Sequence, residues 1–405
     1  MPGVTQASVP FSATVASVLL DAVRAVSAVL VLISHWRNAF FVDFADVHSF
    51  RTVALIPYII AGAGHQAVII FFVLSGYLVG GTTLRSLRKG EWSWKRYLTH
   101  RLVRLWMVLI PALLLGLLWD TIGIRMSLSP ELYAGRGSDH MTPDVASALT
   151  LKTFLGNALF LQTISVKPLG SNGALWSLAN EWWYYLLFPL AACAFGTAYK
   201  RRTSLAISLA LFCGIVWFAG KDIVILFPVW LFGALLAAIP RPRFELRTLF
   251  LCGITLLYLA TFFGFSLLAH SGKDIGGIQF SSPIADIFLG ALTFLFLWAL
   301  LSKSGRAANT MLQRTARGTA QFSYTLYVTH LPLVIFFEAT FVRQSRWTLT
   351  PTHLLAALAV LAAVVGYSWS VAALTERKTN TIRGWIEKTF LPEVEKNVPA
   401  ARVRN

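Results

Sequence analysis

Charged residues are scarce in this chain of 405 residues: they make up 13% of it, whereas hydrophobic residues make up 56%. A soluble globular protein carries about a quarter of charged residues. The shortage therefore argues against an ordinary soluble domain. Runs of about twenty apolar residues, long enough to cross a bilayer as helices, instead recur along nearly the whole sequence.

Cysteine is also rare. Cys193, Cys213 and Cys252 all lie in apolar runs, with no CxxC or Cys/His spacing beside them, so we expect neither disulfides nor a bound metal. The first thirteen residues contain no Lys or Arg, which is unlike an ordinary signal peptide, and we expect the first apolar run to remain as a helix. No internal repeat or low-complexity linker indicates a second, soluble domain.

The apolar runs predict an all-α fold, a polytopic integral membrane bundle of about ten transmembrane helices. Residues 145–165 are apolar but short and contain Lys152, which favours an interfacial or re-entrant piece. We predict a transmembrane domain over 1–375 and a short polar cytoplasmic tail over 376–405. The ten predicted spans are 14–36, 53–80, 100–120, 176–198, 203–220, 223–239, 248–268, 284–302, 320–341 and 352–374.

Lys and Arg are concentrated in alternate connectors between these spans. One set includes Arg85, Arg88 and Lys89, whereas the connector after the first span holds only Arg37 and Arg51. This bias follows the positive-inside rule and predicts that both termini are cytoplasmic. The net charge of +17 is then explained by cytoplasmic loops beside anionic lipid, so the expected partner is the lipid bilayer and not nucleic acid.

The first apolar run contains two ionisable residues, Arg24 and His35, eleven positions apart. At about 100° per residue they share one helix face, about 16 Å apart along the axis. Asp21 lies one turn before Arg24 on the same stripe. Ionisable residues inside membrane helices are costly and usually face a polar interior, so this stripe is a candidate functional site.

The predicted orientation assigns a depth to the other polar residues. Arg101 and Arg104 begin the third span on the cytoplasmic side, and Ser75 lies toward the cytoplasmic end of the second. Glu181 is expected in the outer part of its span, at the depth of His35, and His330 near mid-membrane. The arginines are suited to bind a polyanionic co-substrate on the cytoplasmic side. A histidine with a carboxylate suits removal of a proton from a hydroxyl on the other.

Five segments in order, LDAVRAVSAVLVLISH, FFVLSGYLVGG, RLVRLW, WSLANEWWYYLLFP and SYTLYVTHLPL, resemble the acyltransferase-3 family of bacterial membrane O-acyltransferases. The resemblance covers residues 18 to 370 or so. It implies a ten-helix bundle that uses acyl-CoA, often acetyl-CoA, as a co-substrate to acylate a glycan or another hydroxyl acceptor. Arg24 and His35 match the family's Arg-to-His motif, whose His is the essential catalytic residue, and Arg101 and Arg104 match its arginine motif.

This sequence departs from the family pattern at three places. His100 stands where the family often has a further arginine, Met107 precedes a proline that comes later than usual, and Trp182 replaces a frequent second acid. Glu181 is therefore the carboxylate that this motif offers.

The resulting hypothesis is a multi-pass O-acyltransferase of the bacterial inner membrane, which moves an acetyl group from acetyl-CoA to a carbohydrate or glycolipid acceptor. His35 would be the general base, or would form an acyl-histidine intermediate. The predicted site comprises His35, Arg24 and Glu181 as catalytic residues, Arg101, Arg104, Ser75 and Tyr77 for the donor, and Asp21, Trp176, Tyr185, Tyr327 and His330 for the substrate.

Structural roles compete with several of these assignments. Arg101 and Arg104 could anchor a helix at the interface, and Glu181 could pair with an arginine across helices. Tyr327 and His330 suit packing between helices, and Ser75 followed by Gly76 suits close helix approach more than nucleophilic chemistry. The alternative to an enzyme is a transporter or flippase that moves a lipid-linked or anionic solute along the same polar stripe.

Overall fold

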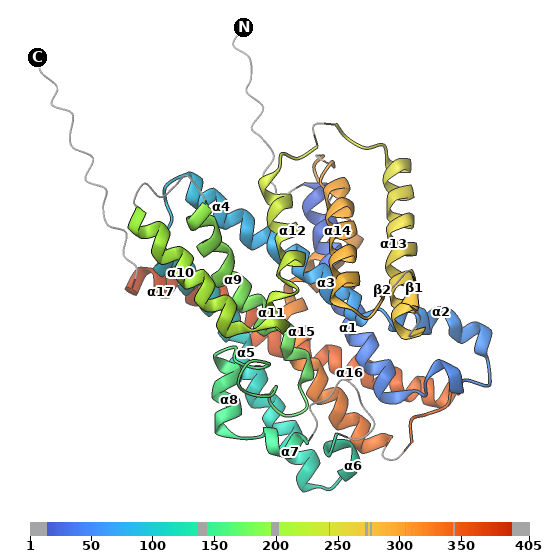
Figure 1. The fold of residues 1–405 in the computed structure, drawn as a ribbon. Coiled ribbons are helices and arrows are strands. Elements are labelled where there is room, and N and C mark those ends of the chain that lie inside the picture. The colour runs from blue at the N-terminus through green and yellow to red at the C-terminus, as the bar shows by residue number, and fades with distance from the viewer. Residues whose placement is uncertain are drawn as a thin grey trace, which may run out of the picture.

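The computed structural model describes residues 14–135, 144–195, 202–242, 244–271, 274–275, 278–303, 305–308, 310–342 and 345–390. They form an all-α bundle, which confirms the predicted fold class (Figure 1). Two strands of two residues each, β1 (Asp274–Ile275) and β2 (Ile278–Gln279), pair antiparallel beside it. Of the predicted polar tail, residues 391–405 lie outside the described residues.

The helices follow one another with short connections. Their bounds are α1 Val15–Phe40, η2 Phe44–Asp46, α2 Arg51–Ala61, α3 Gly64–Ser75, η3 Gly76–Gly80, α4 Gly81–Arg88, α5 Trp94–Arg125, α6 Pro130–Tyr133, α7 Val145–Ala148, α8 Leu151–Ala158, η4 Gly173–Leu175, α9 Trp176–Phe195, α10 Arg202–Ala219, α11 Lys221–Val224, α12 Phe227–Ala238, α13 Thr248–Ser271, α14 Pro283–Leu300, α15 Met311–Phe341, α16 Pro351–Leu374, η5 Glu376–Lys378 and α17 Thr379–Phe390.

Seven helical segments in the described part of the chain are long and apolar enough to cross a membrane. The protein is therefore a multi-pass membrane protein, as predicted, whereas the count of ten spans stays a prediction. The three other predicted spans correspond to α9, α10 and α15. The seven segments are Val15–Phe40, Arg51–Arg88, Trp94–Arg125, Lys221–Ala238, Thr248–Ser271, Pro283–Leu300 and Pro351–Phe390.

Helices α1 and α15 form a parallel central pair. At their N-terminal ends the amide of Val15 donates to the carbonyl of Gly305 over 2.8 Å, and at the opposite ends the amide of Trp347 donates to the carbonyl of Phe40 over 2.7 Å. Threonine side chains start both helices. Thr14 accepts from the amide of Ser17, and Thr310 forms a capping box with Gln313. The Arg24 to His35 stripe of α1 is thereby fixed against α15.

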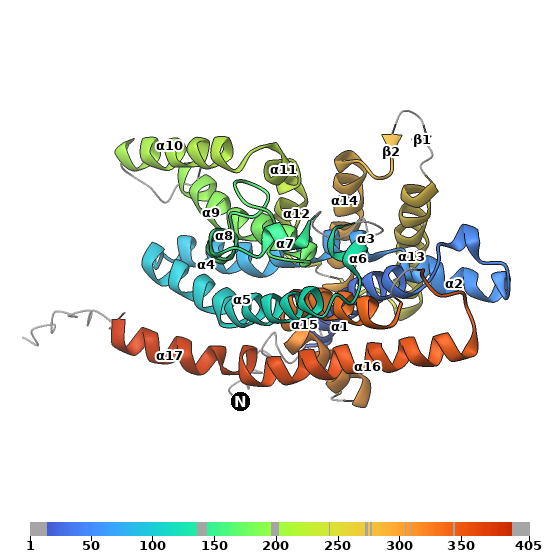
Figure 2. The same cartoon turned by 90° about the horizontal axis from the view of Figure 1, so that it is seen from below.

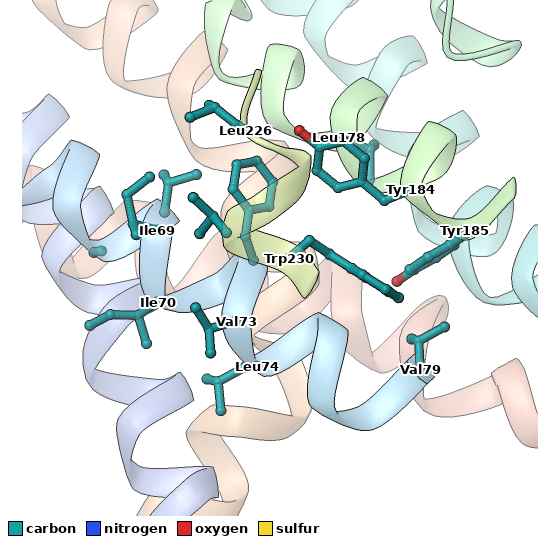
Figure 3. Packing of buried hydrophobic residues seen from close by; sticks show 14 of the residues in the cluster. Ile69, Ile70, Val73, Leu74, Val79, Leu178, Tyr184, Tyr185, Leu226 and Trp230 are labelled. Carbon is teal, nitrogen blue, oxygen red and sulfur yellow. The ribbon is translucent and has the colours of Figure 1, made fainter. Parts of the chain in front are cut away.

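Glycines let α3 and η3 lie directly against α12. A Cβ atom at Gly76 would stand 2.0 Å from the carbonyl oxygen of Trp230, and one at Gly233 would stand 1.9 Å from the carbonyl oxygen of Val73. Both approaches exclude any side chain, so the interpretation of Gly76 as a close-packing residue is confirmed. Figure 3 shows the result: Trp230 reaches across the end of α3 toward Tyr185 of α9.

Helices α16 and α17 run in line along one side of the bundle, beside α5 and α15 (Figure 2). Glu387 of α17 pairs with His100 of α5, and the ammonium group of Lys95 donates to the carbonyl of Phe390 over 3.0 Å. Residues 376–390, predicted as the start of a polar tail, thus form helical elements that pack on α5.

Candidate functional site

A cavity of 760 Å³ lies between α1, α3, α5, α9 and α15, and residues of η3, α4, η5 and α17 complete its wall. Its lining combines many cations with few anions. Five arginines, Arg24, Arg101, Arg104, Arg377 and Arg383, face two carboxylates, Glu181 and Glu376. The cavity therefore carries the charge that a polyanionic ligand requires.

The arginines of α5 are not neutralised by acidic side chains. Among the described residues, neither Arg101 nor Arg104 forms an ion pair within 4.0 Å. Arg101 donates to the Thr82 hydroxyl over 3.3 Å, and its guanidinium carbon lies 5.7 Å from the ring centroid of Tyr185. An arginine held this way keeps donors available, and the guanidinium fork matches phosphate oxygens.

Arg24 belongs to the same cavity. Its Nη2 atom lies 2.7 Å from Oδ1 of Asp21, as the i, i+3 spacing predicted, and Arg104 and Glu376 also act on it electrostatically. A separate hollow of 90 Å³ adjoins this pair. Arg24 and His35 share one face of α1, but only Arg24 is among the residues that line the large cavity.

Side chains from three helices, α3, α9 and α12, form a hydrogen-bonded group around one carboxylate. The hydroxyls of Ser75 and Tyr185 both donate to Oε1 of Glu181, and the indole of Trp230 donates to the Ser75 hydroxyl over 3.2 Å. Ser75, predicted to bind the acyl-CoA donor, and Tyr185, predicted to bind the substrate, are thus joined through Glu181. A carboxylate therefore lies in direct contact with the Ser75 hydroxyl.

The prediction that Glu181 lies at the depth of His35 is wrong. A Cβ atom at Gly64 would meet the side chain of Ser34, so the start of α3 lies level with His35. Ser75 is eleven residues further along α3, about 16 Å away along the axis. Glu181 lies at that second level because its carboxylate accepts from the Ser75 hydroxyl. The first residue of α9, Trp176, already packs on Phe72, with ring centroids 6.0 Å apart.

The buried His330 and the half-buried His35 form a pair. Nδ1 of His35 lies 2.7 Å from Nε2 of His330, and the rings stack with centroids 5.0 Å apart. His330 of α15 therefore lies beside His35 of α1, whereas its depth in the membrane stays a prediction.

The backbone of α15 determines which nitrogens carry protons. Nδ1 of His330 lies 2.9 Å from the carbonyl oxygen of Leu326, which can only accept, so this nitrogen carries the proton. Nε2 of His330 is then an acceptor in the neutral ring, and His35 must donate from Nδ1. Neutral His35 consequently has its basic lone pair on Nε2. This is the orientation of a general base whose second nitrogen is held by a partner.

Two aromatic rings lie between the cavity and the histidine pair. Phe71 and Tyr327 both line the cavity and contact each other edge to face, with centroids 6.0 Å apart. The Tyr327 ring also lies 6.1 Å from that of His330, and its hydroxyl is 2.6 Å from that of Ser177. The rings form a layer that separates the arginine-lined cavity from the two histidines.

The remaining predicted residues lie outside this arrangement. Tyr77 packs against the hydrophobic core and is not among the residues that line the cavity. Trp176 stacks against His65, which in turn bonds Asp286 over 3.0 Å. Sequence analysis missed the contribution of Glu376 and Arg383 to the cavity wall. The sequence did contain a signal for this contribution: charged residues recur at helical spacing after the last predicted span.

Comparison with known proteins gives two matches and one negative result. The family model described as an acyltransferase domain matches residues 18–372. An O-acetyl transferase of Shigella phage Sf6 is 25% identical over 217 residues, which cover 52% of this chain and 57% of that protein. The chain thus spans little more than half the length of this curated relative. No solved structure matches the chain.

Proposed function

The chain belongs to the acyltransferase-3 family, and on this premise we propose that it is an O-acyltransferase of the bacterial inner membrane. It transfers an acyl group, acetyl in the simplest case, from acyl-CoA to a hydroxyl of an extracytoplasmic or lipid-linked carbohydrate. One observation carries the proposal: an arginine-lined cavity and a histidine pair lie on either side of the Phe71 and Tyr327 rings.

The cavity suits the donor. Coenzyme A carries phosphates at one end and the thioester at the other, and Arg101 and Arg104 present unpaired guanidinium groups one turn apart on α5. Arg24 adds a third cation, partly balanced by Asp21. The thioester arm of the donor then points toward Phe71 and Tyr327, beyond which His35 lies.

The histidine pair supplies the base. Nε2 of His35 takes the proton of the acceptor hydroxyl, and the oxygen attacks the thioester carbonyl carbon. A carbon–oxygen bond forms, the carbon–sulfur bond breaks, and the proton returns to the departing thiolate. His330 accepts the hydrogen bond of His35 Nδ1 throughout and so favours the protonated imidazole. Glu181 holds Ser75 and Tyr185 in the cavity wall and is a positioning residue.

Release of free CoA tests the proposal directly. The purified protein in lipid nanodiscs should release thiol from acetyl-CoA only when a carbohydrate acceptor is present. A transporter or flippase would move its solute without releasing thiol. Thiol release without any acceptor would instead indicate a hydrolase and contradict the proposal.

Replacement of Arg104 should weaken donor binding selectively. In Arg104→Ala we expect the KM for acetyl-CoA to rise by about tenfold or more, because hydrogen bonds to charged groups contribute about 1.5–3 kcal/mol. Arg104→Lys should recover only part of the loss, since an ammonium cannot form the fork. Arg96→Ala, an exposed neighbour on the same helix, is the control. An unchanged donor KM in folded Arg104→Ala would return this residue to an anchoring role.

The proposed sidedness places both termini, Arg88 and Arg306 in the cytoplasm, because only this arrangement follows the Lys/Arg bias. Single cysteines at positions 88 and 306, in a background where Cys193, Cys213 and Cys252 are alanine, should resist a membrane-impermeant maleimide in spheroplasts. They should react after permeabilisation. Labelling of either position in intact spheroplasts would reverse the orientation and put the arginine-lined cavity on the outer side.

A further inference from the structure

Two arginines beyond the residues that the family model matches contribute to the cavity. Arg377 of η5 and Arg383 of α17 line it, yet both lie past residue 372, where the match to the family model ends. The reaction described above assigns them no role. Their position therefore raises the question of which part of the donor they meet.

Arg383 lies at the end of the cavity that is remote from the histidine pair. The hydroxyl of Tyr324 reaches the carbonyl of Leu105, and further along both helices Phe336 contacts Trp119. Helices α5 and α15 are thus parallel, and His330 lies level with the part of α5 that follows Leu105. His100, which pairs with Glu387 of α17, precedes Leu105 on α5. α17 consequently closes the opposite end.

The positive charge around His100 is only partly balanced by Glu387, which pairs with His100. Arg101 and Arg383 line the cavity together with His100. Glu387 is engaged with His100, and Arg377 lies over the Trp369 ring, with its guanidinium carbon 4.8 Å from the centroid. Within the described residues Arg383 forms no ion pair within 4.0 Å. A half-buried guanidinium beside another arginine is stabilised when an anion binds between them.

We propose that Arg383 is a second anion subsite, which binds the ribose 3′-phosphate of the CoA donor while Arg101 and Arg104 bind its diphosphate. This rests on the proposed function. The thioester must point toward Phe71 and Tyr327, so the group at Arg383 belongs to the other end of the donor. In CoA that end carries a phosphomonoester, with a charge close to −2 and three acceptor oxygens, which the guanidinium fork matches.

Comparison of CoA with 3′-dephospho-CoA tests the subsite. By isothermal titration in nanodiscs, the wild-type protein should bind CoA at least about tenfold more tightly than dephospho-CoA, the usual loss for one charged hydrogen bond. Arg383→Ala should bind CoA only as tightly as the wild type binds dephospho-CoA, and its dephospho-CoA affinity should stay unchanged. Arg383→Lys should keep part of the discrimination. Lys388→Ala, an exposed cation of the same helix, should behave as wild type.

The outcomes separate this subsite from the proposed reaction. If Arg383→Ala and Arg383→Lys lose the same affinity for CoA and for dephospho-CoA, the subsite is overturned and the donor assignment stays intact. The same holds if both variants still discriminate between CoA and dephospho-CoA as the wild type does. Absence of CoA binding to the wild-type protein would overturn the CoA donor, and the subsite with it. A loss confined to the ligand that carries the 3′-phosphate supports both.

Discussion

His35→Ala abolishes acyl transfer while leaving donor binding intact: this is the largest effect that we expect of any single substitution. A general base accelerates proton transfer by about 10²–10⁴-fold, so kcat should fall by at least that order. His35 is not among the residues that line the cavity, and the affinity for CoA should therefore stay within about twofold of wild type, since no charged hydrogen bond to the donor is lost.

Two controls make the His35 result specific. His48→Ala removes an exposed histidine of the same predicted membrane side and should leave kcat unchanged. Thermal unfolding in detergent should show that His35→Ala remains folded. Near-normal transfer by His35→Ala, in a protein that still requires an acceptor, would remove His35 from the reaction.

His330 provides the second large effect. In His330→Leu the Nδ1–H group of the half-buried His35 loses its acceptor, and nothing selects the tautomer that places the lone pair on Nε2. By analogy with metal-bound histidines, removal of an orienting partner costs about 10–100-fold, and we expect kcat to fall by that range. The donor KM should not change.

His330→Gln separates orientation from packing. Its amide oxygen can accept from His35 and its NH₂ group can donate to the Leu326 carbonyl, so most of the activity should return. Steady-state kinetics of the two variants give the comparison. Equal activity of the leucine and glutamine variants would show that His330 only fills space. An increase in donor KM with unchanged kcat would place it in the cavity instead.

The sequence predicted the helical class and the separate components of the site because these depend on local pattern. Arg24 and Asp21 pair as the helical spacing requires, and the apolar runs around them became helices. Depth was harder to predict. Glu181 was placed with His35 on the assumption that its helix starts at a membrane surface, but its hydrogen bond with Ser75 puts it about three turns further along α3.

Contacts between distant segments had no local signature. The pairing of His35 with His330 joins residues 295 positions apart, and it depends on how α1 and α15 are aligned. The role of α17 was missed for another reason: Arg383 and Glu387 have the composition of a solvated tail, and only their contact with α5 turns them into a cavity wall. Residue type predicted the chemistry of each group, and helix packing decided which groups meet.

A continuous file of water molecules through a membrane protein conducts protons and dissipates the membrane potential. In the proposed enzyme, hydrated arginines approach from one side and an acceptor sugar from the other, so such a file would otherwise be close to complete. The apolar edges of the Phe71 and Tyr327 rings would interrupt such a file between the cavity and the histidine pair. The proposed enzyme would then transfer acyl groups across the membrane without dissipating a proton gradient.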